Sequence, residues 1–230
     1  MKKYIIILSL FLAASCCQNP SPAIPQDKEI ESNVRELLNE MTLEEKIGQM
    51  TQVTATILVD GDNNITPEAE ALLRKYKVGS VLNPPVRVGT PPAEVAAFVK
   101  KINDIIMDET GIPCLYGLDH IHGTSFILGG VLFPQEINLA ASFNRELAEE
   151  MGKVTAYESR AANVPWSFSP TMDISRNPLW PRFWESCGED VYVNAGETKV
   201  VDTRTSYVDL SKYDEKLENS RSVCSEICTQ

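Results

Sequence analysis

The chain is poor in histidine, with only two imidazoles among its 230 residues. A metal centre built from three or four imidazoles is therefore excluded. Basic residues are also scarce, because 21 Lys and Arg stand against 32 Asp and Glu, for a formal net charge of -11. Since nucleic-acid phosphates demand clustered basic side chains, this deficit argues against a nucleic-acid partner. No apolar run reaches 18 residues, so the sequence predicts no transmembrane helix.

The N-terminal segment has the pattern of an export signal. Residues 1–15 (MKKYIIILSLFLAAS) place two lysines before a short apolar run that ends in small residues. Cys16 follows directly, as at the processing site of bacterial lipoproteins, where the cysteine is acylated. We expect lipidation at Cys16 and a periplasmic or outer-membrane location; an ordinary signal peptide cut after Ser15 is the alternative. The Pro-rich, polar residues 18–32 are expected to form a flexible linker between membrane and domain.

The central part of the chain alternates predicted helices and strands. Apolar residues at helical spacing predict helices over residues 33–41, 43–50, 67–76, 92–107 and 145–160. Short apolar runs predict strands over residues 78–82, 112–118 and 165–172. This alternation is typical of the α/β class, with a parallel sheet and crossover helices. In such folds the chemistry gathers at the C-terminal ends of the strands.

Two predicted strand ends carry polar side chains of complementary kinds. Asp119 follows the strand over 112–118, and Arg176 follows the strand over 165–172. A carboxylate accepts hydrogen bonds from vicinal hydroxyls, and a guanidinium donates a rigid fork to the same kind of diol. All three tryptophans fall within residues 166–184, so a pocket with both charges and aromatic rings suits a sugar. A buried Asp–Arg ion pair beside core aromatics is the alternative interpretation.

The two histidines form an H-x-H pair beside Asp119. On a strand, His120 and His122 would point to one face, as a binuclear metal hydrolase requires. Such a site needs further imidazoles, which the chain lacks. We therefore favour a structural role, in which both rings hydrogen-bond the loop backbone and pack near a pocket, and we assign no metal ligands.

Five segments carry a more specific signal. They are residues 38–50 (LNEMTLEEKIGQM), 76–83 (YKVGSVLN), 112–123 (IPCLYGLDHIHG), 133–143 (FPQEINLAASF) and 168–190 (FSPTMDISRNPLWPRFWESCGED). In this order they resemble the N-terminal catalytic domain of glycoside hydrolase family 3. The resemblance covers residues 33–190 and implies a (β/α)8 TIM-barrel-like domain. A full barrel takes ~250 residues, so we expect an incomplete barrel, its first half only.

The resemblance also implies an activity. It indicates a β-glucosidase-like, exo-acting hydrolase of O-glycosyl bonds, with a β-linked glucoside or oligosaccharide as substrate and no cofactor. It assigns Asp119 and Arg176 to the hydroxyls of the terminal sugar. Arg182 and Glu185 lie in the same motif, and we read them as residues that fix a loop rather than as substrate contacts.

The chain departs from the family pattern after residue 190. The family continues with a Lys-His motif and then a Ser-Asp-Trp-like motif that holds the nucleophile, yet neither Lys-His nor Ser-Asp occurs here. We therefore assign no catalytic residue and expect a truncated or frame-shifted, inactive form with a divergent polar tail over residues 191–230. A non-catalytic sugar-binding or remnant lipoprotein is the alternative.

An incomplete barrel has consequences for packing. We expect its inner strand faces to be uncovered, so that Val78, Val81, Leu115 and Tyr116 lack partners across the barrel. The sequence leaves open whether any of four cysteines pair: Cys114, Cys187, Cys224 and Cys228.

Overall fold

The computed structural model describes residues 27–85 and 89–195, and the chain divides into two compact units, residues 1–42 and 43–230. The expected signal peptide over 1–15 and the expected lipidation at Cys16 lie outside the described residues, as do Cys224 and Cys228. Within the part that the structure describes, no helix is both long and apolar enough to cross a membrane.

The first unit contains one described helix, α2 (Lys28–Glu40). It starts inside the expected linker over 18–32, so the last residues of that segment are helical. The physical reason is an N-terminal cap: the Asp27 carboxylate accepts hydrogen bonds from the backbone N–H groups of Glu29 and Ile30. No residue of α2 is buried.

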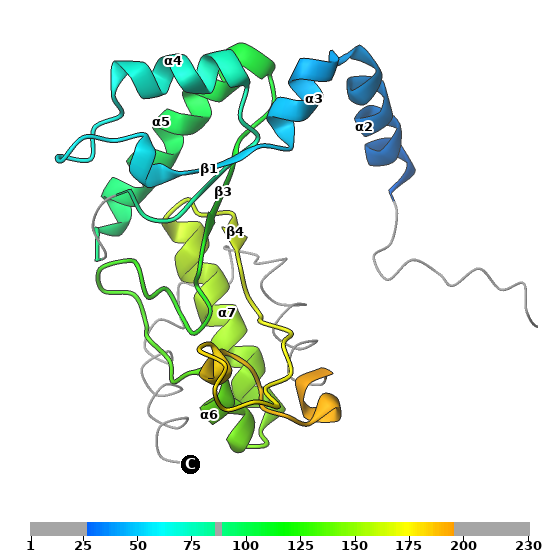
Figure 1. The fold of residues 1–230 in the computed structure, drawn as a ribbon, viewed down its shortest axis with the longest axis vertical. Helices are drawn as coiled ribbons and strands as arrows, with labels where there is room; N and C mark the ends of the chain where they lie inside the picture. The colour runs from blue at the N-terminus through cyan, green and yellow to red at the C-terminus, as the bar shows by residue number, and fades with distance from the viewer. Residues whose placement is uncertain (1–26, 86–88, 196–230) are drawn as a thin grey trace, which may run out of the picture. The chain divides into compact units, whose positions relative to one another are not determined.

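The second unit holds a four-stranded parallel sheet in the order β1-β2-β3-β4 (Figure 1). Its elements, in chain order, are α3 (Leu43–Gln49), β1 (Gln52–Thr54), η1 (Ala55–Ile57), α4 (Pro67–Tyr76), β2 (Ser80–Leu82), α5 (Pro92–Thr110), β3 (Leu115–Leu118), α6 (Glu136–Ala141), α7 (Arg145–Ala161), β4 (Trp166–Ser167) and η2 (Phe183–Glu185). The predicted α/β class with a parallel sheet is confirmed.

Local sequence signals explain where the main helices begin and end. Thr66 caps α4 by accepting a hydrogen bond from the backbone of Ala69, and Pro67 opens the helix. Asn144 caps α7 in the same way, with its side chain accepting from two backbone N–H groups. Gly111 ends α5 in the left-handed conformation that glycine adopts without strain.

The main core lies between the sheet and the helices that cover it. Val78, Val81 and Tyr116 are buried there, and the ring of Phe98 on α5 meets the Tyr116 ring edge-on at 6.1 Å. The expectation that these three residues lack partners is therefore wrong, because their side chains face the helical layer. Leu115, whose side chain takes the opposite face, is 52% exposed as expected.

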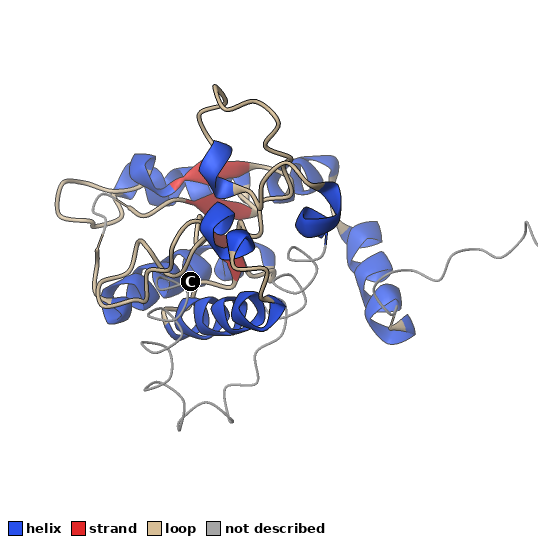
Figure 2. Cartoon of the chain, turned by 90° about the horizontal axis from the view of Figure 1, so that it is seen from below, coloured by secondary structure: helices blue, strands red, loops and turns tan. Residues whose placement is uncertain are grey.

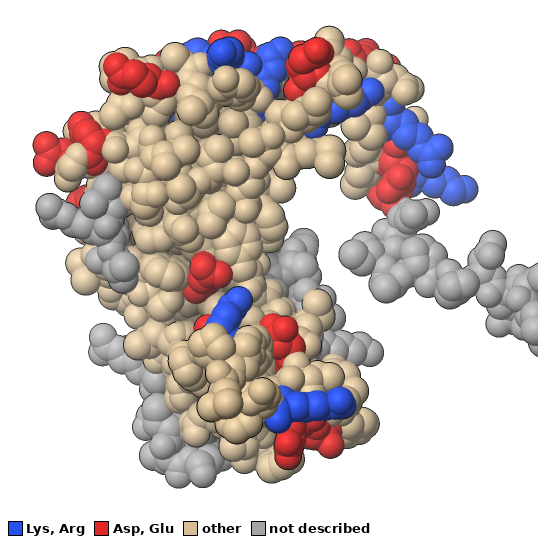
Figure 3. All heavy atoms as spheres, viewed as in Figure 1, with Lys and Arg blue, Asp and Glu red and all other residues tan. Residues whose placement is uncertain are grey.

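The strands run through the middle of the second unit, with helices on their flanks and long loops between them (Figure 2). The face drawn in Figure 3 carries charged side chains over α4 and a second group lower down, with a broad uncharged area between them. The candidate site lies in the loops that follow the C-terminal ends of β3 and β4.

Candidate functional site

A cavity of about 350 Å³ opens beside the C-terminal end of β3. Its lining comes from the loop that follows β3 and from the segment that contains η2. The residues are Asp119, Ile121, His122, Ser125, Phe126, Gln135, Arg182 and Glu185. The cavity therefore combines two carboxylates and a guanidinium with apolar side chains, so it can offer both polar and apolar contacts to a small molecule.

Asp119, one of the two substrate-binding residues expected from the sequence, lines the cavity. It comes directly after β3 and its side chain is only partly exposed. Burial raises the pKa of Asp119 above its ordinary value, the Arg182 guanidinium opposes that rise, and Glu185 adds to it. The carboxyl group of Asp119 is thus electrostatically coupled to the other two charged groups of the cavity.

The structure does not bring Arg176 to this cavity. Arg176 is exposed and is not among the lining residues, whereas Arg182 is. The Arg182 side chain forms an ion pair with Glu185, with Nε donating to Oε2 at 2.7 Å. This ion pair fits the loop-fixing role expected for these residues, yet the same side chains also line the cavity beside Asp119.

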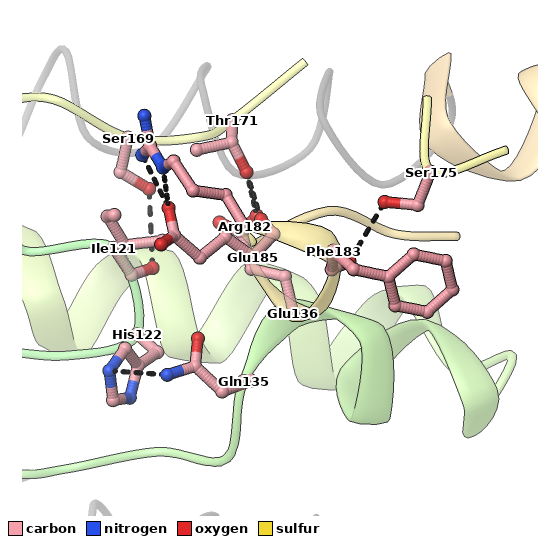
Figure 4. A network of polar contacts seen from close by, with 10 residues as sticks. All are labelled: Ile121, His122, Gln135, Glu136, Ser169, Thr171, Ser175, Arg182, Phe183 and Glu185. Atoms are coloured by element: carbon pink, nitrogen blue, oxygen red, sulfur yellow. Dashed lines mark hydrogen bonds and ion pairs between the residues drawn. The ribbon is translucent and has the colours of Figure 1, made fainter. Parts of the chain in front are cut away.

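His122 and Gln135 form a polar pair on the cavity wall (Figure 4). Nδ1 of His122 lies 2.7 Å from the backbone carbonyl of Phe133, so this nitrogen carries the proton and donates it. In the neutral ring Nε2 is then an acceptor, and it receives a hydrogen bond from the Gln135 amide at 3.2 Å. The Gln135 carbonyl oxygen is buried and has no partner among the described residues.

His120 makes different contacts from His122. Its side chain is fully buried, Nδ1 lies 2.7 Å from the Ser159 hydroxyl on α7, and its ring stacks on Phe126. Burial lowers the pKa of His120 to about 4, so the ring is neutral. Among the described residues, no three His, Cys, Asp or Glu side chains are grouped so that they could hold a metal ion.

Comparison with known families gives one match that covers most of the chain. The glycosyl hydrolase family 3 N-terminal domain matches residues 42–203. The match ends beyond residue 190, where the motifs had stopped, and residues 191–195 are helical. The first residues of the expected polar tail are thus structured and lie within the matched domain.

Curated relatives share this part of the sequence. The lysosomal beta glucosidase of Dictyostelium discoideum is 36% identical over 172 residues, which are 70% of this chain and 21% of the relative. The periplasmic beta-glucosidase of Salmonella typhimurium is 30% identical over 171 residues, 73% of this chain and 20% of the relative. The chain thus spans about a fifth of the length of these relatives.

Solved structures show the same similarity. An exo-1,3/1,4-beta-glucanase from a Pseudoalteromonas species superposes with a TM-score of 0.68 at 30% identity, over 82% of this chain and 24% of that one. A beta-glucosidase from Listeria innocua in complex with glucose gives a TM-score of 0.59 at 31% identity, over 74% of this chain and 23% of that one.

The buried His120 ring predicts a loss of stability in acid. The folded chain keeps this ring neutral down to a pKa of about 4, whereas the unfolded chain binds a proton near the ordinary value of 6.5. The free energy of unfolding should therefore fall as the pH drops from 6.5 to about 4, by on the order of 3 kcal/mol from this group.

Urea unfolding of the wild-type chain and of His120→Asn across this pH range measures the effect. The variant keeps a hydrogen-bonding group near Ser159 but cannot titrate, so its slope against pH should be clearly shallower. Equal slopes in both proteins would show that His120 is not the group responsible.

Proposed function

Because this chain belongs to glycosyl hydrolase family 3, we propose that its cavity binds the terminal sugar of a β-linked glucoside or oligosaccharide. The match places the chain in the N-terminal domain of the family, which has a TIM-barrel-like α/β fold, and its curated relatives are glycosidases. The proposed parent activity is hydrolysis of O-glycosyl bonds by an exo-acting enzyme.

The observation that carries this proposal is the meeting of Asp119 and Arg182 at one cavity. The Asp119 carboxylate can accept hydrogen bonds from sugar hydroxyls, and the Arg182 guanidinium can donate to hydroxyl oxygens. Phe126 and Ile121 supply apolar surface for the faces of the ring. The structure of the Listeria innocua relative with glucose supports a monosaccharide as the ligand.

We expect Asp119→Ala and Arg182→Ala each to weaken glucose binding by roughly 10- to 100-fold, the range for hydrogen bonds that involve a charged group. Arg176→Ala is the matched control, because Arg176 lies in the same motif but is exposed and outside the cavity. Titration with glucose, followed by NMR, measures the three affinities. A large loss in Arg176→Ala with none in Arg182→Ala would restore the assignment made from the sequence.

We further propose that these 230 residues hold substrate without hydrolysing it. A retaining glycosidase needs a nucleophile and an acid/base separated by ~5–5.5 Å, and the motif expected to hold the nucleophile does not occur in the sequence. The purified chain should release no product from an aryl β-glucoside above the blank. Turnover near the typical enzyme value of ~10 per second would contradict this.

The proposed location is outside the cytoplasm, attached by a lipid on Cys16. The support is the lysine-rich, apolar pattern of residues 1–15 and the periplasmic location named for the Salmonella relative. Mass spectrometry of the mature N-terminus in a bacterial host should find an acylated cysteine at position 16, and Cys16→Ser should lose it. An unmodified Cys16 at the mature N-terminus would instead indicate an ordinary signal peptide.

A further inference from the structure

Glu136 is a carboxyl group buried behind the cavity wall. Glu136 is the first residue of α6 and is only 2% exposed, and α6 packs against η2. Its Oε2 lies 2.6 Å from the Thr171 hydroxyl, in the loop that follows β4. The same hydroxyl contacts the backbone carbonyl of Glu185 in η2 (Figure 4). Three segments of the chain thus meet through one hydroxyl group.

The number of protons available at these contacts bears on whether the Glu136 carboxyl is protonated. The Thr171 hydroxyl has a single proton to donate, and the Glu185 carbonyl can only accept. If Glu136 were ionised, it too could only accept, and the single Thr171 proton would have to be shared between two acceptor oxygens. If Glu136 is protonated, it donates to Thr171, which then donates to Glu185, and both contacts are hydrogen bonds.

The surroundings of Glu136 favour the neutral form. Its Oε1 is buried without a partner among the described residues, which costs far less for a neutral carboxyl than for a carboxylate. Burial raises the pKa of Glu136 to about 8, hydrogen bonds from the Thr171 side chain and backbone oppose that rise, and the negative charge of Glu185 on η2 adds to it. The cation that lines this wall, Arg182, is paired with Glu185. From α7, the side chains packed in the cluster with α6 are apolar: Leu147, Ala148 and Met151.

We infer that Glu136 is a positioning residue that acts as a neutral hydrogen-bond donor. Through the Thr171 hydroxyl it holds in place the segment around η2 that carries Arg182 and Glu185, the ion pair on the cavity wall. Glu136 does not line the cavity, so it acts only through these partners. Deprotonation removes the donor and releases η2 from the loop after β4. This inference stands on the contacts within the chain, and its consequence for sugar binding rests on the proposed function.

Hydrogen exchange of the full chain without sugar tests the inference. Amide protection of the segment over 182–186 is compared at about pH 6 and about pH 9, on either side of the pKa of about 8, after correction for the intrinsic rate. In the wild type this protection should fall roughly fivefold at the higher pH, the change expected from losing one hydrogen bond.

Four variants separate a donor role from general packing. Glu136→Gln keeps a neutral donor, so its protection should stay high at both pH values, whereas Glu136→Ala should be low at both. Thr171→Ser keeps the hydroxyl and should behave like the wild type, while Thr171→Val should be low at both. If Glu136→Ala or Thr171→Val does not fold, the wild type and Glu136→Gln still give the comparison.

Glu158→Gln is the matched control. Glu158 is a partly buried glutamate on α7 whose carboxylate accepts hydrogen bonds from Thr124 and Val131, in the loop between β3 and α6. It should leave protection of 182–186 unchanged. Protection that does not depend on pH in the wild type, or that drops in Glu136→Gln at about pH 6, would overturn the inference.

The exchange experiment uses no sugar, so a result that overturns the inference about Glu136 does not count against the proposed function. A chain that shows the expected exchange but binds no glucose would count against the proposed function alone.

Discussion

The parallel pairing of β3 with β4 is the constraint on which the cavity depends. Gly117 pairs with Trp166 and Leu118 with Ser167, so both strands end at one edge of the sheet. A Cβ on Gly117 would collide with the Phe168 ring, so glycine is needed for this approach. Beyond the strands, the Ser167 hydroxyl donates to the carbonyl of His120 and that of Ser169 to Ile121. The loop that leads to Thr171 is thus fastened beside the loop that begins at Asp119.

The sequence was sufficient for elements whose signals are local. The apolar spacing of the helices located α4, α5 and α7, and the resemblance singled out Asp119, which lines the cavity. It was insufficient where tertiary contacts decide. β1 (Gln52–Thr54) is three residues long with Val53 as its one apolar residue, so it is too short to show a strand pattern in the sequence. It is a strand because its backbone pairs with β2.

The position of Arg182, rather than Arg176, at the cavity has the same origin. Both arginines lie in one motif, and spacing along the chain cannot tell which reaches the cavity. In the folded loop the buried residue is Ser175, whose hydroxyl donates to the carbonyl of Phe183 and whose backbone N–H donates to Gly188. With Ser175 anchored inward, its neighbour Arg176 is exposed, and the chain returns through η2 with Arg182 at the cavity. Tertiary packing also decided the burial of the strand side chains. The helical layer covers Val81 and Tyr116, so their burial does not require the opposite wall of a barrel.

The ionisable groups that line the cavity differ in exposure and charge from those buried behind it. The groups that line the cavity, Asp119, Arg182 and Glu185, are ionisable and at least partly exposed, so water or a polar ligand can compensate them. The groups behind them, His120 and Glu136, are buried, and burial moves the pKa of each in the direction that keeps it neutral. His120 is neutral above a pKa of about 4 and Glu136 is neutral below a pKa of about 8. Between these limits both can make neutral hydrogen bonds to Ser159 and Thr171, and neither places an uncompensated charge in the interior.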